Sequence, residues 1–227
     1  MAVNSGPDST AQDGLVFYMD PANKDTYPGS GTVATDLTSG ITGSLRNGTS
    51  VESNNAGVFQ FDGTNDFANF NTVVNSQIKP TSSYSVSAWF KIDDNSGTKT
   101  IISNGNSVGY MVWCQSGRLK YYHNATSGGF GQIASNATFS TNTWNNFLIH
   151  WEANAKTTIY FNGKYDNQSS STKADVVYGA TNDLVIGRYT AIGYYFEGQI
   201  GPISIYNRVL SPEEILKNYN ALKGRFS

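Results

Sequence analysis

The chain has 227 residues and a formal net charge of −2, and charged residues make up 14% of it, against about 25% in an average soluble protein. A nearly neutral chain lacks the basic surface that attracts phosphate backbones or anionic membranes, so we expect neither a nucleic acid nor a membrane as partner. Hydrophobic residues, at 38%, supply a core, and this length is common for a single all-β domain.

Residues 1–13 are small and polar, so we expect an N-terminal arm there and one domain over residues 14–227. Such an arm becomes ordered where it docks, either along its own domain or on a neighbouring subunit. The arm lacks the basic start and apolar stretch of a secretory signal, and no apolar run approaches the ~20 residues that span a bilayer. We therefore expect a chain that is made in the cytoplasm and stays soluble.

From residue 14 onward, short β-type runs alternate with turns rich in Gly, Asn, Ser and Asp. In the run 84–90, alternate residues beginning with Tyr84 are apolar, and Ser85 and Ser87 lie between them, which is the period of a strand with one buried face. Similar runs cover residues 15–19, 58–61, 67–70, 100–103, 110–113, 119–123, 147–151, 157–161, 184–187 and 199–206. So many closely spaced strands predict an all-β sandwich or jelly roll.

One helix is expected, over residues 211–223. Ser211 and Glu214 have the spacing of a capping box, and Pro212 suits the first helical position. An apolar stripe follows on one side of the helix, made of Ile215, Leu216, Tyr219 and Leu222. We expect the stripe to pack on the sandwich of its own chain, and the alternative is an exposed helix that binds a partner.

Residues suited to catalysis or metal binding are sparse. Cys114 is the only cysteine, so no disulfide forms within the chain and a cysteine-rich zinc site is excluded. Neither His123 nor His150 stands in a serine or cysteine nucleophile motif. We therefore expect a protein that is not an enzyme.

A family resemblance rests on blocks in a fixed order: Gly14–Asp20 with Phe61–Phe67, then Tyr84–Phe90 with Trp144–Phe147 and Ile159–Lys164, then Leu184–Arg188 leading into Gly198–Ile215. Together these blocks resemble the LamG-like branch of the concanavalin A-like lectin/glucanase superfamily over nearly the whole chain. The resemblance implies a jelly-roll β-sandwich of two antiparallel sheets. Residues 20–31 and 205–226 are further similar to LamG-like proteins of tailed bacteriophages, which are virion surface components.

The same superfamily includes retaining glucanases, which need two carboxylates roughly 5 Å apart, conventionally as Glu-x-Asp-x-Glu on one strand. This spacing is absent here, because Glu52, Glu152 and Glu197 stand alone and the pair Glu213-Glu214 belongs to the expected helix start. A degenerate glucanase is thus the least favoured reading of the sequence.

A structural calcium ion is common in LamG-like domains, between a loop that corresponds to residues 36–43 and an acidic pair in the last strand. In this chain Gly201-Pro202 takes the place of that pair, so we expect no metal or other cofactor, with Asp36 as the remnant of the site. Asp62 and Asp66 flank a glycine-containing turn, and we expect them to cap the turn rather than bind a cation.

Sugar binding needs an aromatic platform with polar partners, because a sugar ring offers both C–H surface and hydroxyls. Phe130 lies in a Gly-rich loop, and the other candidates fall in two groups. The first, Trp113, Tyr121 and Tyr122 with His123, lies on neighbouring expected strands, and the second is Arg188 with Tyr189, Tyr194 and Tyr195.

Two functions follow from the resemblance. The first is a non-enzymatic structural protein on the virion surface of a tailed phage, a capsid decoration or other appendage, whose residues 1–13 contact other virion proteins. The alternative is a carbohydrate-binding adhesion module that recognises host surface glycans. The two are compatible, and the sequence leaves open whether the chain forms a homo-oligomer.

Overall fold

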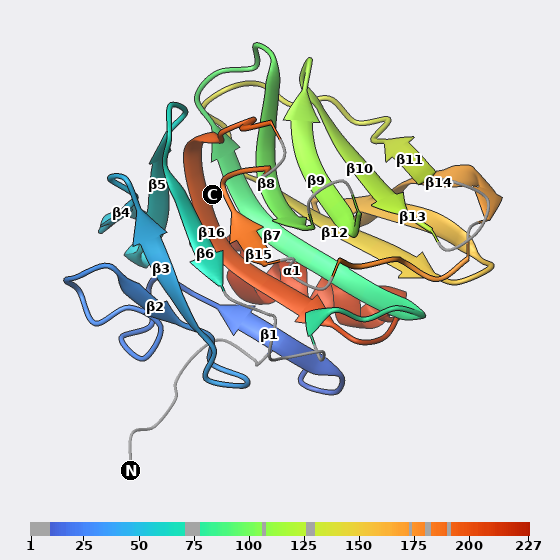
Figure 1. Ribbon diagram of the computed structural model, residues 1–227, viewed down its shortest axis with the longest axis horizontal. Coiled ribbons are helices and arrows are strands. Elements are labelled where there is room, and N and C mark those ends of the chain that lie inside the picture. Colours follow the sequence, from blue (N-terminus) through green and yellow to red (C-terminus); the bar gives the residue numbers. More distant parts are fainter. Residues whose placement is uncertain are drawn as a thin grey trace.

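A computed structural model describes residues 10–70, 78–105, 108–125, 130–172, 174–179, 183–189 and 192–227. These residues form two eight-stranded antiparallel sheets packed face to face, with one helix near the C-terminus (Figure 1). The expected all-β sandwich of two antiparallel sheets with a short C-terminal helix is confirmed.

The first sheet, sheet A, runs in the order β14 (Lys164–Thr172), β13 (Lys156–Phe161), β12 (Asn145–Glu152), β7 (Ser83–Ile92), β16 (Glu197–Tyr206), β5 (Val58–Asp62) and β4 (Ser50–Glu52), and β1 (Leu15–Met19) also pairs with β16. The second, sheet B, runs in the order β11 (Phe130–Ala134), β10 (Arg118–Asn124), β9 (Tyr110–Gln115), β8 (Thr98–Asn104), β15 (Leu184–Ile186), β6 (Phe67–Phe70), β3 (Thr42–Arg46) and β2 (Val33–Thr35). A 3₁₀ turn (Asn54–Ala56) separates β4 from β5.

The core lies between the inner faces of the two sheets. On β7, Tyr84, Val86 and Phe90 belong to this core, whereas Trp89 packs in a separate cluster on the outer side of sheet A. The alternation predicted for residues 84–90 is therefore confirmed. Burying each such large apolar side chain contributes about 1.5–3 kcal/mol, so the core stabilises the fold without disulfides.

Helix α1 (Pro212–Lys223) covers part of the outer face of sheet A and lies behind that sheet in Figure 1. The predicted capping box is present, since the Ser211 hydroxyl accepts a hydrogen bond from the Glu214 N–H and the Glu214 carboxylate accepts one from the Ser211 N–H. Ile215 is buried against Leu148 of β12 and Leu210, which confirms that the helix packs on its own sandwich. Leu216, which the sequence places in the same stripe, is instead 48% exposed. No helix of the described residues is long and apolar enough to cross a membrane.

The end of the expected N-terminal arm docks on its own domain. The Ala11 N–H donates to Oδ1 of Asn218 on α1 (2.7 Å), and the Ala11 carbonyl accepts from the Tyr206 hydroxyl (3.0 Å). Asp13 pairs with Arg208 at 2.9 Å. Residues 10–13 therefore dock along their own domain, as in the first of the two alternatives for the arm. Residues 1–9 lie outside the described part of the chain.

Candidate functional site

The outward-facing side chains of β8, β9 and β10 form a continuous face of sheet B. Leu119, Tyr121 and Val112 point into the core, so the residues between them in the alternation point outward. Across the strands, Trp113 lies opposite both Lys120 and Thr100, and Met111 lies opposite Tyr122 and Ser103. We call this set the sheet B face: Thr100, Ser103, Met111, Trp113, Lys120 and Tyr122.

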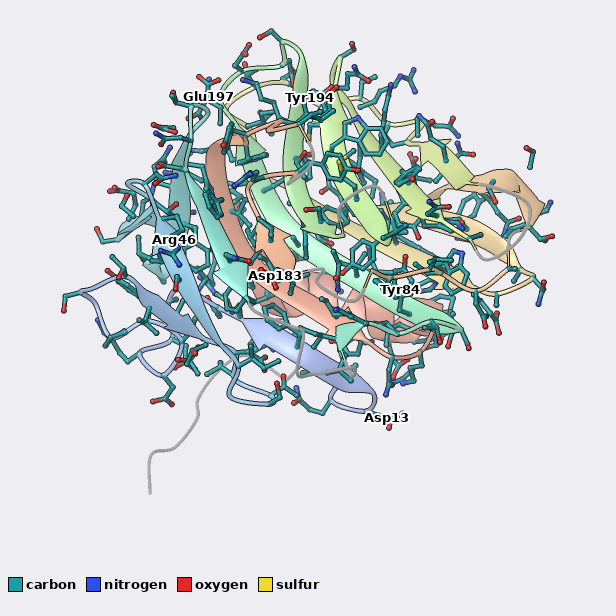
Figure 2. All side chains as sticks on the ribbon, viewed as in Figure 1. Asp13, Arg46, Tyr84, Asp183, Tyr194 and Glu197 are labelled. Carbon is teal, nitrogen blue, oxygen red and sulfur yellow. The ribbon has the colours of Figure 1, made fainter. Side chains whose placement is uncertain are left out.

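The segment between β15 and β16 runs along this face. The Ser103 hydroxyl donates to the Arg188 carbonyl (2.8 Å), and the Thr100 N–H donates to the Tyr194 carbonyl (3.1 Å). Tyr189 and Gly193 exchange two backbone hydrogen bonds, both of 3.0 Å. These bonds hold the described parts of the segment against β8, and Figure 2 shows Tyr194 beside that strand.

Three tyrosines meet on the sheet B face, and we call Tyr122, Tyr189 and Tyr194 the tyrosine cluster. The rings of Tyr189 and Tyr194 stack nearly parallel, with 6.5 Å between centroids and 19° between planes. Burial raises the pKa of the Tyr122 hydroxyl, and the neighbouring Tyr189 raises it further. Tyr194 has a φ of 43°, an uncommon backbone conformation for a bulky residue, and its side chain is 40% exposed.

Polar and cationic groups lie on the same side of sheet B as the cluster. Lys120 donates to Oε1 of Gln115 (2.7 Å), and Gln115 in turn donates to the Thr98 hydroxyl (3.2 Å). The guanidinium of Arg188 lies over the Phe67 ring, 4.7 Å from its centroid, and 5.6 Å from that of Tyr195. The face therefore combines half-exposed aromatic rings with hydrogen-bonding groups.

The structure brings four of the candidate sugar-binding residues to this side of sheet B from two distant parts of the chain: Trp113, Tyr122, Arg188 and Tyr194. Trp113 is only 7% exposed, so it offers little surface to a ligand.

The structure contradicts the expectation that Tyr121 binds a ligand. It alternates with Tyr122 on β10 and is fully buried, with its hydroxyl hydrogen-bonded to that of Tyr84 in the core, so it offers no surface to a ligand. The His123 side chain, two residues further along β10, is also buried, and its Nε2 accepts a hydrogen bond from the Trp151 indole (3.1 Å). The side chain of Phe130 lies outside the described part of the structure.

Sequence reasoning missed Lys120, Gln115 and Thr98 as polar neighbours of Trp113. The available signal was the Ser116-Gly117 turn, because a tight hairpin there sets Lys120 opposite Trp113 and places both on one face.

The acidic residues singled out in the sequence serve the loops that carry them. The buried Asp36 carboxylate accepts hydrogen bonds from the N–H groups of Tyr18 (2.7 Å), Thr38 (3.1 Å) and Ser39 (2.7 Å), and from the Ser39 hydroxyl (2.6 Å). Oδ1 of Asp62 accepts a hydrogen bond from the Thr64 N–H (2.8 Å), which confirms the predicted turn cap at Asp62.

No group of three or more His, Cys, Asp or Glu side chains suited to a metal ion occurs among the described residues.

Two of the glutamates form ion pairs. Glu197 pairs with Lys99 at 2.6 Å, and Glu214 pairs with Arg208 at 2.6 Å. The Arg208 guanidinium lowers the pKa of Glu214 to about 2.

Residues 61–216 match the family model of the concanavalin A-like lectin/glucanases superfamily. Comparison with curated proteins finds no match. Domain 4 of AbnA, an extracellular arabinanase from Geobacillus stearothermophilus solved in complex with arabinotriose, superimposes with a TM-score of 0.72 and 15% identity, covering 92% of this chain and 100% of that one.

Botulinum neurotoxin binding domains have the same fold. The receptor binding domain of the C/D mosaic serotype gives a TM-score of 0.69 at 16% identity, covering 91% of this chain and 51% of that one. The binding domain of the DC toxin, solved in complex with SialylT, gives 0.72 at 14% identity, covering 92% and 52%. The chain thus spans about half the length of these toxin domains.

Proposed function

Because the chain belongs to the concanavalin A-like lectin/glucanases superfamily, we propose that it is a non-catalytic glycan-binding module that holds its ligand on the sheet B face. The tyrosine cluster supplies the platform for a sugar ring. Lys120 and Gln115 lie on the outer face of sheet B, and Arg188 precedes Tyr189 in the chain. Their polar groups are suited to the ring's hydroxyl groups.

The observation that carries this proposal is the stacking of Tyr189 on Tyr194 beside Tyr122. A buried hydrophobic core would hide these rings, whereas here Tyr194 is exposed and Tyr122 and Tyr189 are half-buried. A tyrosine ring offers an apolar face to the C–H groups of a sugar and a hydroxyl to its oxygens, at low cost in conformational entropy.

Two of the related structures support the ligand class. One is an arabinanase domain in complex with arabinotriose, and the other is a toxin binding domain in complex with SialylT. A sandwich of this kind is therefore suited to present a sugar-binding surface.

The other expectation from the sequence, a structural role on the virion surface of a tailed phage, gains no support from the family match or from the relatives described above. It stays a prediction of the sequence. A glycan-binding module is compatible with it, but the proposal does not depend on it.

A glycan array followed by isothermal titration tests the proposal. We expect saturable binding at the sheet B face, and the affinity of this site should fall at least tenfold, about 1.4 kcal/mol, when Tyr122→Ala and Tyr194→Ala are combined. The matched control is Tyr165→Ala, which removes an exposed tyrosine from β14, on sheet A, and should leave the affinity unchanged. Undiminished binding in the double variant, or no glycan bound on the array, would contradict the proposal.

A further inference from the structure

A second aromatic hollow lies on the opposite side of the molecule, on the outer face of sheet A beside the C-terminal end of α1. It has a volume of about 420 Å³, and its lining includes Trp89, Trp144, Asn162, Tyr219, Asn220 and Phe226. We call it the Trp144 pocket. Its volume falls within the roughly 300–1,000 Å³ typical of small-molecule sites.

Stacked rings form the wall of this pocket. Trp89 of β7 lies parallel to Tyr219 of α1 at 5.4 Å and 12°, and parallel to Phe226 at 4.6 Å and 20°. Trp144 contacts Phe226 at 4.6 Å with a 52° tilt. Trp89 and Phe226 are buried, whereas Trp144 and Tyr219 are only partly buried and form the accessible part of the wall.

Two glycines make room for these rings. A Cβ atom at Gly201 would lie 2.8 Å from Cζ of Phe226, and one at Gly163 would lie 2.8 Å from Cδ1 of Tyr219. Gly163 has a φ of 75° in the turn between β13 and β14, which any other residue would adopt with strain. The strands and the helix therefore fix the aromatic wall in place before any ligand arrives.

Amide groups stand beside the rings. Oδ1 of Asn162 accepts from the Asn146 N–H (2.7 Å), and Nδ2 donates to Oδ1 of Asn145 (3.1 Å), so the orientation of this amide is set. An amide nitrogen carries two hydrogens, which leaves a second donor on Nδ2. Asn220 adds an exposed amide on α1.

Lysine side chains lie around the pocket, and the C-terminal end of the α1 dipole offsets only part of their positive charge. Lys223 lines it at the last turn of α1, where the helix dipole contributes roughly −0.5 of a charge. Lys91 lies with Nζ 5.8 Å from the centroid of Trp144. No acidic side chain is among the lining residues, and the positive charge of Lys223 disfavours a cationic ligand.

We propose that the Trp144 pocket is a second carbohydrate-binding site, which takes one end of a neutral oligosaccharide. Its accessible aromatic surfaces suit the C–H face of a sugar ring, and the amides of Asn162 and Asn220 suit the ring's hydroxyls. The choice of a carbohydrate as ligand rests on the proposed function. The pocket and its lining residues do not depend on it.

A module with sites on opposite faces would bind two glycan chains at once. On a surface dense in glycans, the second contact is intramolecular and increases the avidity without any new type of contact. The Trp144 pocket therefore extends the proposed function from a single-site module to a bivalent one.

Isothermal titration with arabinotriose and with cellotriose separates the two sites. We expect two ligands per wild-type chain, one in the Tyr122→Ala/Tyr194→Ala variant, one in Trp144→Ala, and none when all three changes are combined. Asn220→Ala, which leaves the aromatic wall intact, should weaken binding to the pocket several-fold if Trp144→Ala proves unstable. Thermal unfolding of each variant checks that the fold is retained.

The outcomes that overturn either proposal differ. One ligand per wild-type chain, lost in the double tyrosine variant and unchanged in Trp144→Ala and Asn220→Ala, refutes the pocket and keeps the proposed function. One ligand that is lost in Trp144→Ala, weakened in Asn220→Ala and unchanged in the double tyrosine variant keeps the pocket and refutes the tyrosine cluster. A wild-type dimer that Trp144→Ala dissociates would assign the pocket to a second copy of the chain, and binding of neither probe would refute it as a neutral-sugar site.

Discussion

At the scale of single residues, Gly201 explains a departure from the family pattern. The sequence shows Gly201-Pro202 where LamG-like domains conventionally carry an acidic pair, and the structure shows the ring of Phe226 seated against Gly201. A Cβ there would lie 2.8 Å from Phe226 and 3.3 Å from Cβ of Trp89. The position thus serves the packing of the C-terminal residues on sheet A.

Gly201→Ala should therefore destabilise the fold by about 1–3 kcal/mol, because the added methyl overpacks a closely fitted contact. Chemical denaturation measures this loss. Gly224→Ala is the control, since Gly224 has a φ of −63° and a Cβ added there would meet no atom within 4 Å, and it should be nearly neutral. Equal stabilities for the two variants would contradict the role given to Gly201.

His150 gives a pH-dependent prediction. Burial lowers its pKa from 6.5 to about 4, so the folded state binds its proton at lower pH than the unfolded state does. Its contribution to stability is complete above pH 6.5 and is lost as the pH falls towards 4, by up to about 3 kcal/mol. Denaturation between pH 4.5 and 6.5 should show this slope in the wild type and a shallower one in His150→Gln; identical slopes would refute the assignment.

At the scale of elements, the apolar strands and the helix could be predicted from the sequence because burial imposes a periodic pattern on them. β14 could not be predicted, because its residues Lys164–Thr172 are almost entirely polar and its stability comes from pairing with β13. The short strands β3 and β4 carry too few apolar residues to show a period. Pairing partners, unlike periods, depend on distant parts of the chain.

The candidate site was predictable only in part, for the same reason. The aromatic residues on β9 and β10 could be named from the sequence. Because Lys120 is charged, it is expected to point outward, and the alternation along β10 then places Tyr122 on the same side as Lys120 and Tyr121 on the buried side. The contact of Arg188 and Tyr194 with β8 depends on hydrogen bonds between segments about 90 residues apart, such as Ser103 to Arg188, for which |i−j| is 85. The Trp144 pocket depends on sheet, turn and helix together, so no local pattern indicates it.

The start of α1 gives a prediction at this scale. Ser211→Ala removes the hydroxyl that caps the Glu214 N–H and should cost about 1 kcal/mol of stability. Lys217→Ala, on the exposed side of the same helix, is the control and should change stability little. If both variants unfold at the same denaturant concentration as the wild type, the capping box contributes nothing measurable.

At the scale of the whole molecule, the N-terminal residues tie the two ends of the chain together. Residues 10–13 contact α1 and the end of β16 through Ala11 and Asp13. A chain that begins at residue 14 should therefore lose about 1–3 kcal/mol of stability relative to one that begins at residue 10, since the hydrogen bonds of Ala11 and the ion pair of Asp13 are removed. Equal unfolding midpoints would show that these contacts contribute nothing to stability.

The overall arrangement leaves the two sheets with different outer faces. Sheet A carries α1 and the Trp144 pocket, whereas sheet B carries the tyrosine cluster and the segment that positions it. A sandwich stabilised by its core can support binding groups on both faces without changing its interior. The proposed glycan binding is therefore a property of the surfaces, and substitutions there should spare the fold.

The most direct measurement is a titration of protein carrying carbon-13-labelled tyrosine rings with a glycan found by the array, followed by NMR. The account predicts saturable shifts of the ring signals of Tyr122, Tyr189 and Tyr194, with Tyr165 unchanged. A bound glycan that leaves the signals of the tyrosine cluster in place would contradict the proposal that the sheet B face holds the ligand.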